Sequence, residues 1–238
     1  MSFGQGQQFI FKVIESKRVK ADTVSRYLFA SDFVRDKIAL DAASGSGFGT
    51  FFLAQEAEEV WGIDQSDQAI DYAKKNYQRD NIKFYCGDLL NFDLPKNFFD
   101  VIVSFHTIEQ TDNPKKILDI FSASLKNEGI LIISTPNKKI VSPYHQQPIG
   151  KFHRFEFYKK ELKNILSDKF EIKWYGQRST SKFIANYFIR RFIRLSELLL
   201  KRDFGFFGRR ESFEVKPLKF WQEPKDFIII LTKKNENK

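Results

Sequence analysis

The sequence is poor in the residues that build disulfide frameworks and metal sites, with one cysteine and three histidines in 238 residues. A single cysteine excludes an internal disulfide and fits a reducing compartment. We expect Cys86 to lie buried within a core strand. The histidines lack the spacing of a metal site, so we expect no bound metal.

Long apolar runs are also missing. No stretch reaches the roughly 18–20 apolar residues that span a bilayer, and no secretory signal pattern is seen near the first residue. These features favour a cytoplasmic protein. The length predicts one domain over residues 1–238.

Positive charge is abundant and unevenly placed. The formal net charge is +9, and eleven basic against four acidic side chains fall between Arg178 and Phe220. Apolar spacing predicts a helix over 182–202, within a long connection over 177–223. This connection has three interpretations: a helical cap with solvated charges, a lid that binds phosphate, or a basic surface resting peripherally on the inner membrane. Charge alone also allows nucleic-acid binding, but no RNA-binding appendage accompanies it, so we rank that partner lower.

A glycine-rich run follows the first apolar stretch. Ile38–Asp41 reads as a strand, and Gly45, Gly47 and Gly49 occupy every second position before a helical pattern. Glycine adopts positive φ and lets a ligand approach the backbone closely. A strand, glycine turn and helix in this order predict a nucleotide-type pocket at the carboxyl end of a parallel sheet.

Acids recur at the ends of the next strands. Asp64 closes Val60–Asp64 and Asp88 follows Ile82–Cys86. Asp64 stands where an α/β nucleotide fold places the carboxylate that binds ribose hydroxyls. Further strands are predicted at 99–105, 130–134, 170–175 and 226–232, and helices at 50–57, 66–78 and 113–126. The alternation predicts an α/β, Rossmann-like fold with helices on both faces of the sheet.

These motifs resemble class I S-adenosylmethionine (SAM) dependent methyltransferases, across a core of about 23–137. More specifically, the chain is similar to methyltransferases associated with bacterial surface polysaccharide (O-antigen or capsule) biosynthesis. It rests on four segments: Arg26–Ala30, Ser104–Gln110, Ser134–Asn137 and Phe152–Phe157. The chain departs at Ser44, where cysteine is frequent, and at Gln110, where histidine is frequent. The resemblance implies a seven-stranded sheet with the last strand antiparallel, and a C-terminal helical insertion. Lid elements are expected at 138–160 and 177–223.

SAM, released as S-adenosylhomocysteine, is the cofactor that the resemblance implies. Its expected ligands follow the strands, with one further arginine in the preceding helix. They are Arg26, Asp41, Gly45, Gly47, Asp64, Gln65, Asp88, Leu89, Ser104 and Phe105.

A hydroxyl acceptor needs a base, because its proton leaves as the new bond forms. The expected catalytic residues are His106, Glu109 and His153. Each also has a plainer interpretation as a loop or capping residue, and proximity alone can drive methyl transfer. The expected acceptor contacts are Tyr144, His145, Tyr158, Arg190, Arg191 and Arg194. Arginine suits phosphate through bidentate hydrogen bonds.

The resulting hypothesis is methyl transfer to a small molecule. A sugar or phosphate-bearing, nucleotide-linked or lipid-linked saccharide precursor of a surface polysaccharide is favoured. The alternatives are another small molecule, such as a quinone precursor or an amine, and a SAM-binding module that has lost catalysis. The sequence leaves the methylated atom and the oligomeric state open.

Overall fold

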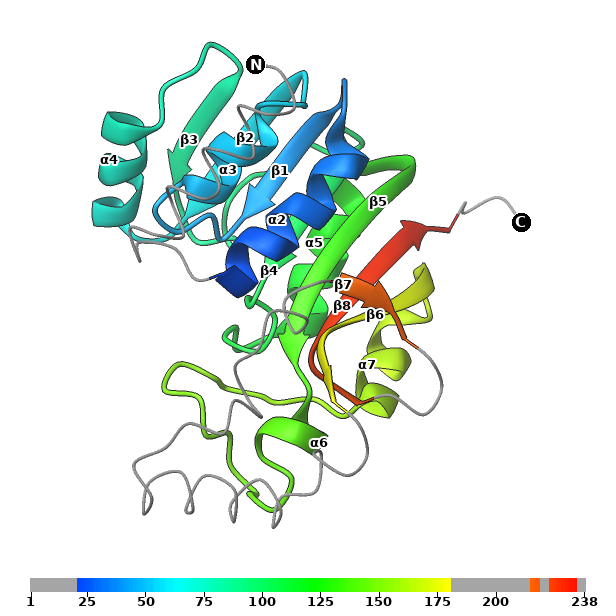
Figure 1. The fold of residues 1–238 in the computed structure, drawn as a ribbon. Coiled ribbons are helices and arrows are strands. Elements are labelled where there is room, and N and C mark those ends of the chain that lie inside the picture. Colours follow the sequence, from blue (N-terminus) through cyan, green and yellow to red (C-terminus); the bar gives the residue numbers. More distant parts are fainter. Residues whose placement is uncertain (1–20, 181–214, 219–222, 235–238) are drawn as a thin grey trace.

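The computed structural model describes residues 21–180, 215–218 and 223–234. An eight-stranded sheet forms its centre, in the order β3-β2-β1-β4-β5-β8-β6-β7 (Figure 1). The strands are β1 (Ile38–Ala42), β2 (Glu59–Asp64), β3 (Ile82–Cys86), β4 (Phe99–Phe105), β5 (Leu125–Pro136), β6 (Phe170–Thr180), β7 (Val215–Pro217) and β8 (Glu223–Lys233).

The sheet confirms the expected topology with one correction. Strands β1 to β5 pair in parallel, and β8 inserts antiparallel between β5 and β6. The expected number of seven strands is wrong, because Val215–Pro217 adds an edge strand that pairs antiparallel with β6. Three residues with a proline carry too little periodicity to be recognised as a strand.

The helices cover both faces of the sheet (Figure 1). They are α2 (Ala21–Val34), α3 (Phe48–Leu53), α4 (Asp67–Asn76), α5 (Pro114–Ser124), α6 (Lys138–Val141) and α7 (Lys159–Leu166). Alternate strand residues point to opposite faces. Ala39 and Val101 accordingly pack with α2 and α3 in one apolar cluster. Their neighbours Leu40 and Ile102 pack with α5 and α7 in the other.

Local sequence signals account for the helix starts. Ser66 caps α4 by accepting a hydrogen bond from the Ala69 amide. Asn113 caps α5 in the same way, and Pro114 follows in the first turn. The expected helix over 113–126 ends earlier, because β5 already begins at Leu125.

The expected connection over 177–223 is shorter than predicted. Residues up to Thr180 extend β6, Val215–Pro217 form β7, and β8 begins at Glu223. The predicted helix over 182–202 lies outside the described residues. Within the part of the chain that is described, no helix is both long and apolar enough to cross a membrane.

Cys86 is exposed, so the expectation of a buried core cysteine is wrong. It is the last residue of β3, the outermost strand on that side of the sheet. No residue of this edge strand is fully buried, so the faces of the sheet are incompletely covered here and the thiol stays accessible.

The glycine run forms the turn between β1 and α3. Gly45 and Gly47 have φ of +55° and +84°, the left-handed region that favours glycine. A Cβ on Gly49 would lie 1.9 Å from Cζ of Tyr27, so α2 packs directly on the bare backbone of α3. A Cβ on Gly45 would meet nothing within 4 Å.

We expect Gly49→Ala to destabilise the fold by about 1–3 kcal/mol, because the added methyl group overpacks against the Tyr27 ring. Gly45→Ala is the matched variant, and backbone strain alone should cost it about 1 kcal/mol. Urea unfolding of both variants and the wild type measures the difference. A Gly49→Ala protein as stable as the wild type would contradict the close packing.

Candidate active site

Two cavities open at the carboxyl ends of the parallel strands. The Asp64 cavity, of about 540 Å³, is lined by residues that include Asp64, Gln65, Asp88 and Leu89. The Arg26 cavity, of about 510 Å³, is lined by residues that include Arg26, Gly45, Ser46 and Asp226. Three residues line both cavities and form their shared wall: Ala43, Phe105 and His106. The cavities are therefore adjacent halves of one site.

In the Asp64 cavity, the Asp64 carboxylate is held in place by backbone amides. It accepts hydrogen bonds from Gly45 N at 2.8 Å and Ser66 N at 3.0 Å. The half-buried carboxylate thus links the glycine turn to the start of α4 and keeps capacity for further hydrogen bonds. This placement suits a ligand with a vicinal diol.

Asp88 lies across the same cavity and orders its own loop. Its carboxylate accepts hydrogen bonds from Leu90 N at 3.0 Å and from Asn91 Nδ2 at 2.7 Å. Leu89, which is 7 % exposed, adds an apolar lining. Together they form a polar and apolar rim suited to a heterocycle.

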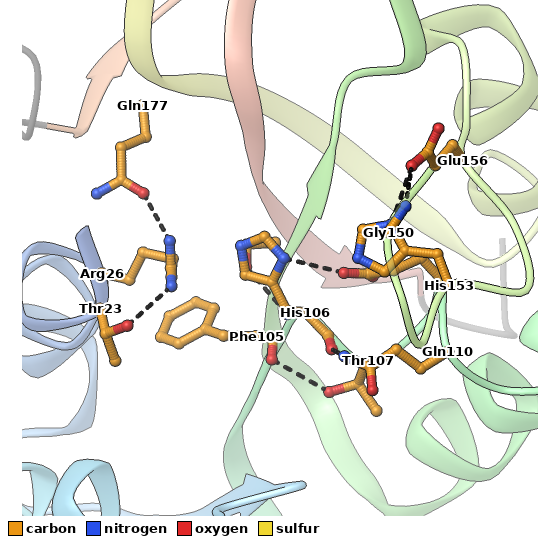
Figure 2. A network of polar contacts seen from close by, with 12 residues as sticks. Thr23, Arg26, Phe105, His106, Thr107, Gln110, Gly150, His153, Glu156 and Gln177 are labelled. Carbon is orange, nitrogen blue, oxygen red and sulfur yellow. Dashed lines mark hydrogen bonds and ion pairs between the residues drawn. The ribbon is translucent and has the colours of Figure 1, made fainter. Parts of the chain in front are cut away.

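Arg26 is a buried cation at the second cavity. It donates hydrogen bonds to Gln177 Oε1 at 2.8 Å and Thr23 Oγ1 at 3.1 Å, and its guanidinium lies over the Phe105 ring (Figure 2). Burial lowers the pKa of Arg26, while the charges of Asp226 and Asp22 act in the opposite direction. The cavity is therefore lined by two cationic side chains, Arg26 and Lys225, and by the carboxylates of Asp22 and Asp226, a mixed charge that suits a zwitterion.

The shared wall carries strained backbone. Ala43 and His106, at the ends of β1 and β4, have φ of +62° and +54°. Non-glycine residues adopt this region at a cost, and such residues gather at functional sites. The backbone therefore turns sharply after β1 and after β4, where the two cavities meet.

His106 is held by a buried carboxylate. Its Nδ1 lies 2.9 Å from Oε1 of Glu109, whose side chain is fully buried. In the tautomer whose Nδ1–H donates a hydrogen bond to Glu109, Nε2 of the neutral imidazole is the nitrogen that can accept a proton. Figure 2 shows His106 in the middle of this polar network, with Arg26 to one side and His153 to the other. This arrangement can position and receive a proton.

Asp41 and Ser104, two of the expected cofactor ligands, lie beneath the site. Neither lines the two cavities. Asp41 is fully buried and accepts hydrogen bonds from Tyr27 Oη at 3.0 Å and Thr50 Oγ1 at 2.7 Å. Ser104 is also fully buried, one residue before Phe105. Gly47, the N-cap residue of α3, lines neither cavity either, whereas the remaining expected cofactor ligands line one cavity or both.

The expected acceptor residues are more dispersed. Tyr144 and Tyr158 are 66 % and 38 % exposed, and His145 is exposed as well; none of the three lines the two cavities. His153, an expected catalytic residue, lies 3.0 Å from Oε1 of Glu156 through its Nδ1 and lines neither cavity. Arg190, Arg191 and Arg194 lie outside the described residues.

Several lining residues lie outside the predicted site, and three of them are polar or charged groups of interest. Asp226, from β8, lines the Arg26 cavity, and Gln110 and Arg154 line the Asp64 cavity. Gln110 donates a hydrogen bond to the His106 carbonyl at 2.6 Å, so it orders the turn that carries the histidine. Asp226 reaches the site only through the antiparallel insertion of β8, which no local spacing reveals. No group of three potential metal ligands gathers in the described ranges.

Comparisons with known proteins agree with this architecture. Residues 34–187 match the family described as "Methyltransferase domain". A Mycobacterium tuberculosis protein named "Probable S-adenosylmethionine-dependent methyltransferase" is 30% identical over 129 residues, which are 54% of this chain and 46% of that protein. A ubiquinone biosynthesis O-methyltransferase from Coxiella burnetii is 28% identical over 115 residues, 48% of this chain and 49% of that protein. The chain thus spans about half the length of these curated relatives.

Solved structures share the fold at low identity. A SAM-dependent methyltransferase from Thermotoga maritima aligns with a TM-score of 0.63 and 18% identity, covering 98% of both chains. One from Archaeoglobus fulgidus aligns with a TM-score of 0.60 and 18% identity, covering 95% of this chain and 99% of that one.

The buried Asp41 gives the protein a defined pH dependence. Burial raises the pKa of Asp41 to about 6, although Thr50 and Tyr27 act against it. The folded protein therefore holds a proton between about pH 4 and pH 6 that the unfolded chain has lost. In that window Asp41 makes stability fall as pH rises, by about 3 kcal/mol in total.

We expect Asp41→Asn to remove this contribution, because the amide does not titrate. The measurement is the free energy of unfolding in urea at several pH values, compared between wild type and variant. The difference in the free energy of unfolding between wild type and variant should change between about pH 4 and pH 6. A constant difference would show that Asp41 is not a buried titrating group.

Proposed function

Because this chain belongs to the methyltransferase domain family, with a domain of the class I, SAM-dependent type, we propose that it methylates a hydroxyl group of a small molecule. The observation that carries the proposal is His106, on the wall shared by both cavities and bonded to the buried Glu109. In this proposal His106 is the base that receives the proton of the acceptor.

The chemistry of each cavity supports one orientation of SAM. The adenosine would occupy the Asp64 cavity, with Asp64 on the ribose and Asp88 and Leu89 near the adenine. The methionine end would occupy the Arg26 cavity, where Arg26 faces its carboxylate and Asp226 its ammonium group. The methyl group would then lie at Phe105 and His106.

When bound, SAM supplies a methyl group on a positively charged sulfur, a strong electrophile. With SAM held by the residues of the two cavities, its methyl group would be available to an acceptor oxygen placed at the shared wall, and S-adenosylhomocysteine would be the leaving product. The acceptor proton goes to Nε2 of His106, and Glu109 stabilises the imidazolium that results. The backbone turn at His106 holds the imidazole at the shared wall.

We infer a sugar or phosphate-bearing saccharide precursor of a surface polysaccharide as the favoured acceptor. Support comes from the resemblance of Arg26–Ala30 and Ser134–Asn137 to that group, and from a base suited to a hydroxyl. Arg190, Arg191 and Arg194 stay predicted ligands of an acceptor phosphate. The cytoplasm, or the inner membrane surface, is the proposed location.

A quinone precursor is the second candidate, favoured by the likeness to the Coxiella burnetii ubiquinone biosynthesis O-methyltransferase. A panel of nucleotide sugars, phenols and amines separates the candidates through release of S-adenosylhomocysteine. Tight SAM binding with no turnover on any acceptor would instead support a binding module without catalysis.

The role of His106 is tested by His106→Gln, with Lys75→Gln as the control, because Lys75 is exposed on α4 and lines neither cavity. We expect His106→Gln to lower kcat by about 10²-fold or more, since a general base is lost. The affinity for SAM should stay within about twofold, because the imidazole acts on the acceptor.

Glu109 is a positioning residue in this scheme. Glu109→Gln should lower kcat by about tenfold or more and alter the pH profile of kcat, because the amide can bond either tautomer of His106. The pH profile separates this role from a merely structural one. Unchanged kcat in both His106→Gln and Glu109→Gln would rule out the base.

The cofactor orientation is tested by Asp64→Ala. This change removes charge-assisted hydrogen bonds of about 1.5–3 kcal/mol, so SAM affinity measured by calorimetry should fall at least about tenfold. Asp71→Ala, on the exposed face of α4, is the control and should bind as the wild type does. Equal affinities of the two variants for SAM would contradict the assignment of Asp64 to the ribose.

A further inference from the structure

Residues 142–156 form a loop whose ends are joined by one buried carboxylate. Glu156, which is 5 % exposed, accepts hydrogen bonds from the Ser142 hydroxyl and from Ile149 N and Gly150 N at 3.3 Å and 3.4 Å. His153 bonds it as well, at 3.0 Å (Figure 2). Burial alone would raise the pKa of Glu156, but these hydrogen bonds lower it below its usual value, so the carboxylate is ionised. We call this segment the Glu156 loop; compact loops with joined ends are frequently functional.

The Glu156 loop and the residue pair after it present large apolar side chains to solvent. Five of the seven exposed large hydrophobic residues of the described chain lie here. They are Tyr144 (66 % exposed), Ile149 (51 %), Phe152 (67 %), Phe155 (39 %) and Tyr158 (38 %). Since Glu156 fixes the backbone, these side chains are held outward instead of folding back onto the protein. Gathered exposed apolar side chains mark an interaction site.

Positive charge predominates around these side chains, and the exposed acid beside them is Glu161, which accepts a hydrogen bond from Tyr158 N. Between Lys138 and Lys160 the acidic residue is Glu156 alone, which is buried. Lys139 and Arg154 pair with Glu223 and Asp112. The remaining lysines of this stretch leave the surface positive: Lys138, Lys151, Lys159 and Lys160. Lys151 and Lys138 lie 5.3 Å and 5.6 Å from the ring centres of Phe152 and Tyr158, so each of these ammonium groups lies beside an exposed aromatic ring.

We propose that the Glu156 loop docks on an anionic membrane surface, with Ile149 and Phe152 entering the interface and Lys151 facing lipid phosphates. Apolar side chains gain free energy by leaving water, and tyrosine suits the boundary between headgroups and acyl chains. Lysine stems can lie along apolar surface while the ammonium group reaches phosphate. The combination of positive charge with exposed aromatic side chains favours a lipid surface.

The loop is also connected to the candidate active site. Arg154 N and Phe155 N donate hydrogen bonds to the Glu109 carbonyl at 2.7 Å and 3.0 Å, and the Glu109 side chain holds His106. A docked loop would thus bring the shared wall of the cavities close to the bilayer surface. The docking itself goes beyond methyl transfer and does not depend on the identity of the acceptor.

The test is co-sedimentation of the full chain with phosphatidylcholine vesicles, with and without phosphatidylglycerol. We expect binding to the anionic vesicles, weakened by salt, and little to the neutral ones. The double variant Ile149→Ser/Phe152→Ser should reduce partitioning by at least about tenfold. Lys151→Glu should reduce it by about tenfold or more, since it replaces an attracted charge by a repelled one.

Matched controls separate the loop from the rest of the basic chain. Leu28→Ser/Tyr72→Ser removes exposed apolar side chains elsewhere, and Lys115→Glu reverses an exposed charge on α5. Both should bind as the wild type does, and thermal unfolding shows that each variant is folded. Absent wild-type binding would overturn the proposal, as would full binding by the loop variants. Concentration-dependent self-association that only the loop variants lose, without vesicle binding, would assign the surface to a second copy of the chain and overturn it too.

Discussion

The walls of the site meet at one buried carboxylate, Asp41. Tyr27 from α2 and Thr50 from α3 donate hydrogen bonds to its two oxygens at the end of β1. Arg26 precedes Tyr27 in α2. The hydrogen bond between Tyr27 and Asp41 that anchors this helix therefore also places the Arg26 guanidinium at the Arg26 cavity. The contact requires a bare backbone at Gly49, against which the Tyr27 ring packs. The buried Asp41 carboxylate, which has no solvent exposure, thus positions the Arg26 guanidinium that a ligand would contact.

A second constraint comes from the sheet. Because β1 and β4 are parallel, their carboxyl ends lie at one edge of the sheet. The backbone turns there after each strand, with positive φ at Ala43 and His106. His106 thus lies between the Asp64 cavity, which is lined by carboxylates, and the Arg26 cavity, which has lining groups of both charges. Glu109 then serves two purposes: its side chain fixes the imidazole, and its carbonyl anchors the Glu156 loop. Base and loop are therefore mechanically connected, although they come from different parts of the chain.

Local patterns predicted much of this structure. The glycine spacing, the acids at strand ends and the apolar periodicity located β1 to β5 and the Asp64 cavity, because each signal lies within a few residues. These local patterns do not predict which residues from distant parts of the sequence lie together. Asp226 faces Arg26 only because β8 inserts between β5 and β6, and Asp41 points to Tyr27 and Thr50 because helix packing decides its partners. The exposed Cys86 follows from its edge position, which periodicity does not report.

The most direct test of the account is a crystal structure of the protein with S-adenosylhomocysteine. We expect the adenosine in the Asp64 cavity, the amino-acid end beside Arg26 and Asp226, and the sulfur next to His106. An adenosine in the Arg26 cavity, or a ligand that leaves the shared wall of Ala43, Phe105 and His106 uncovered, would contradict it.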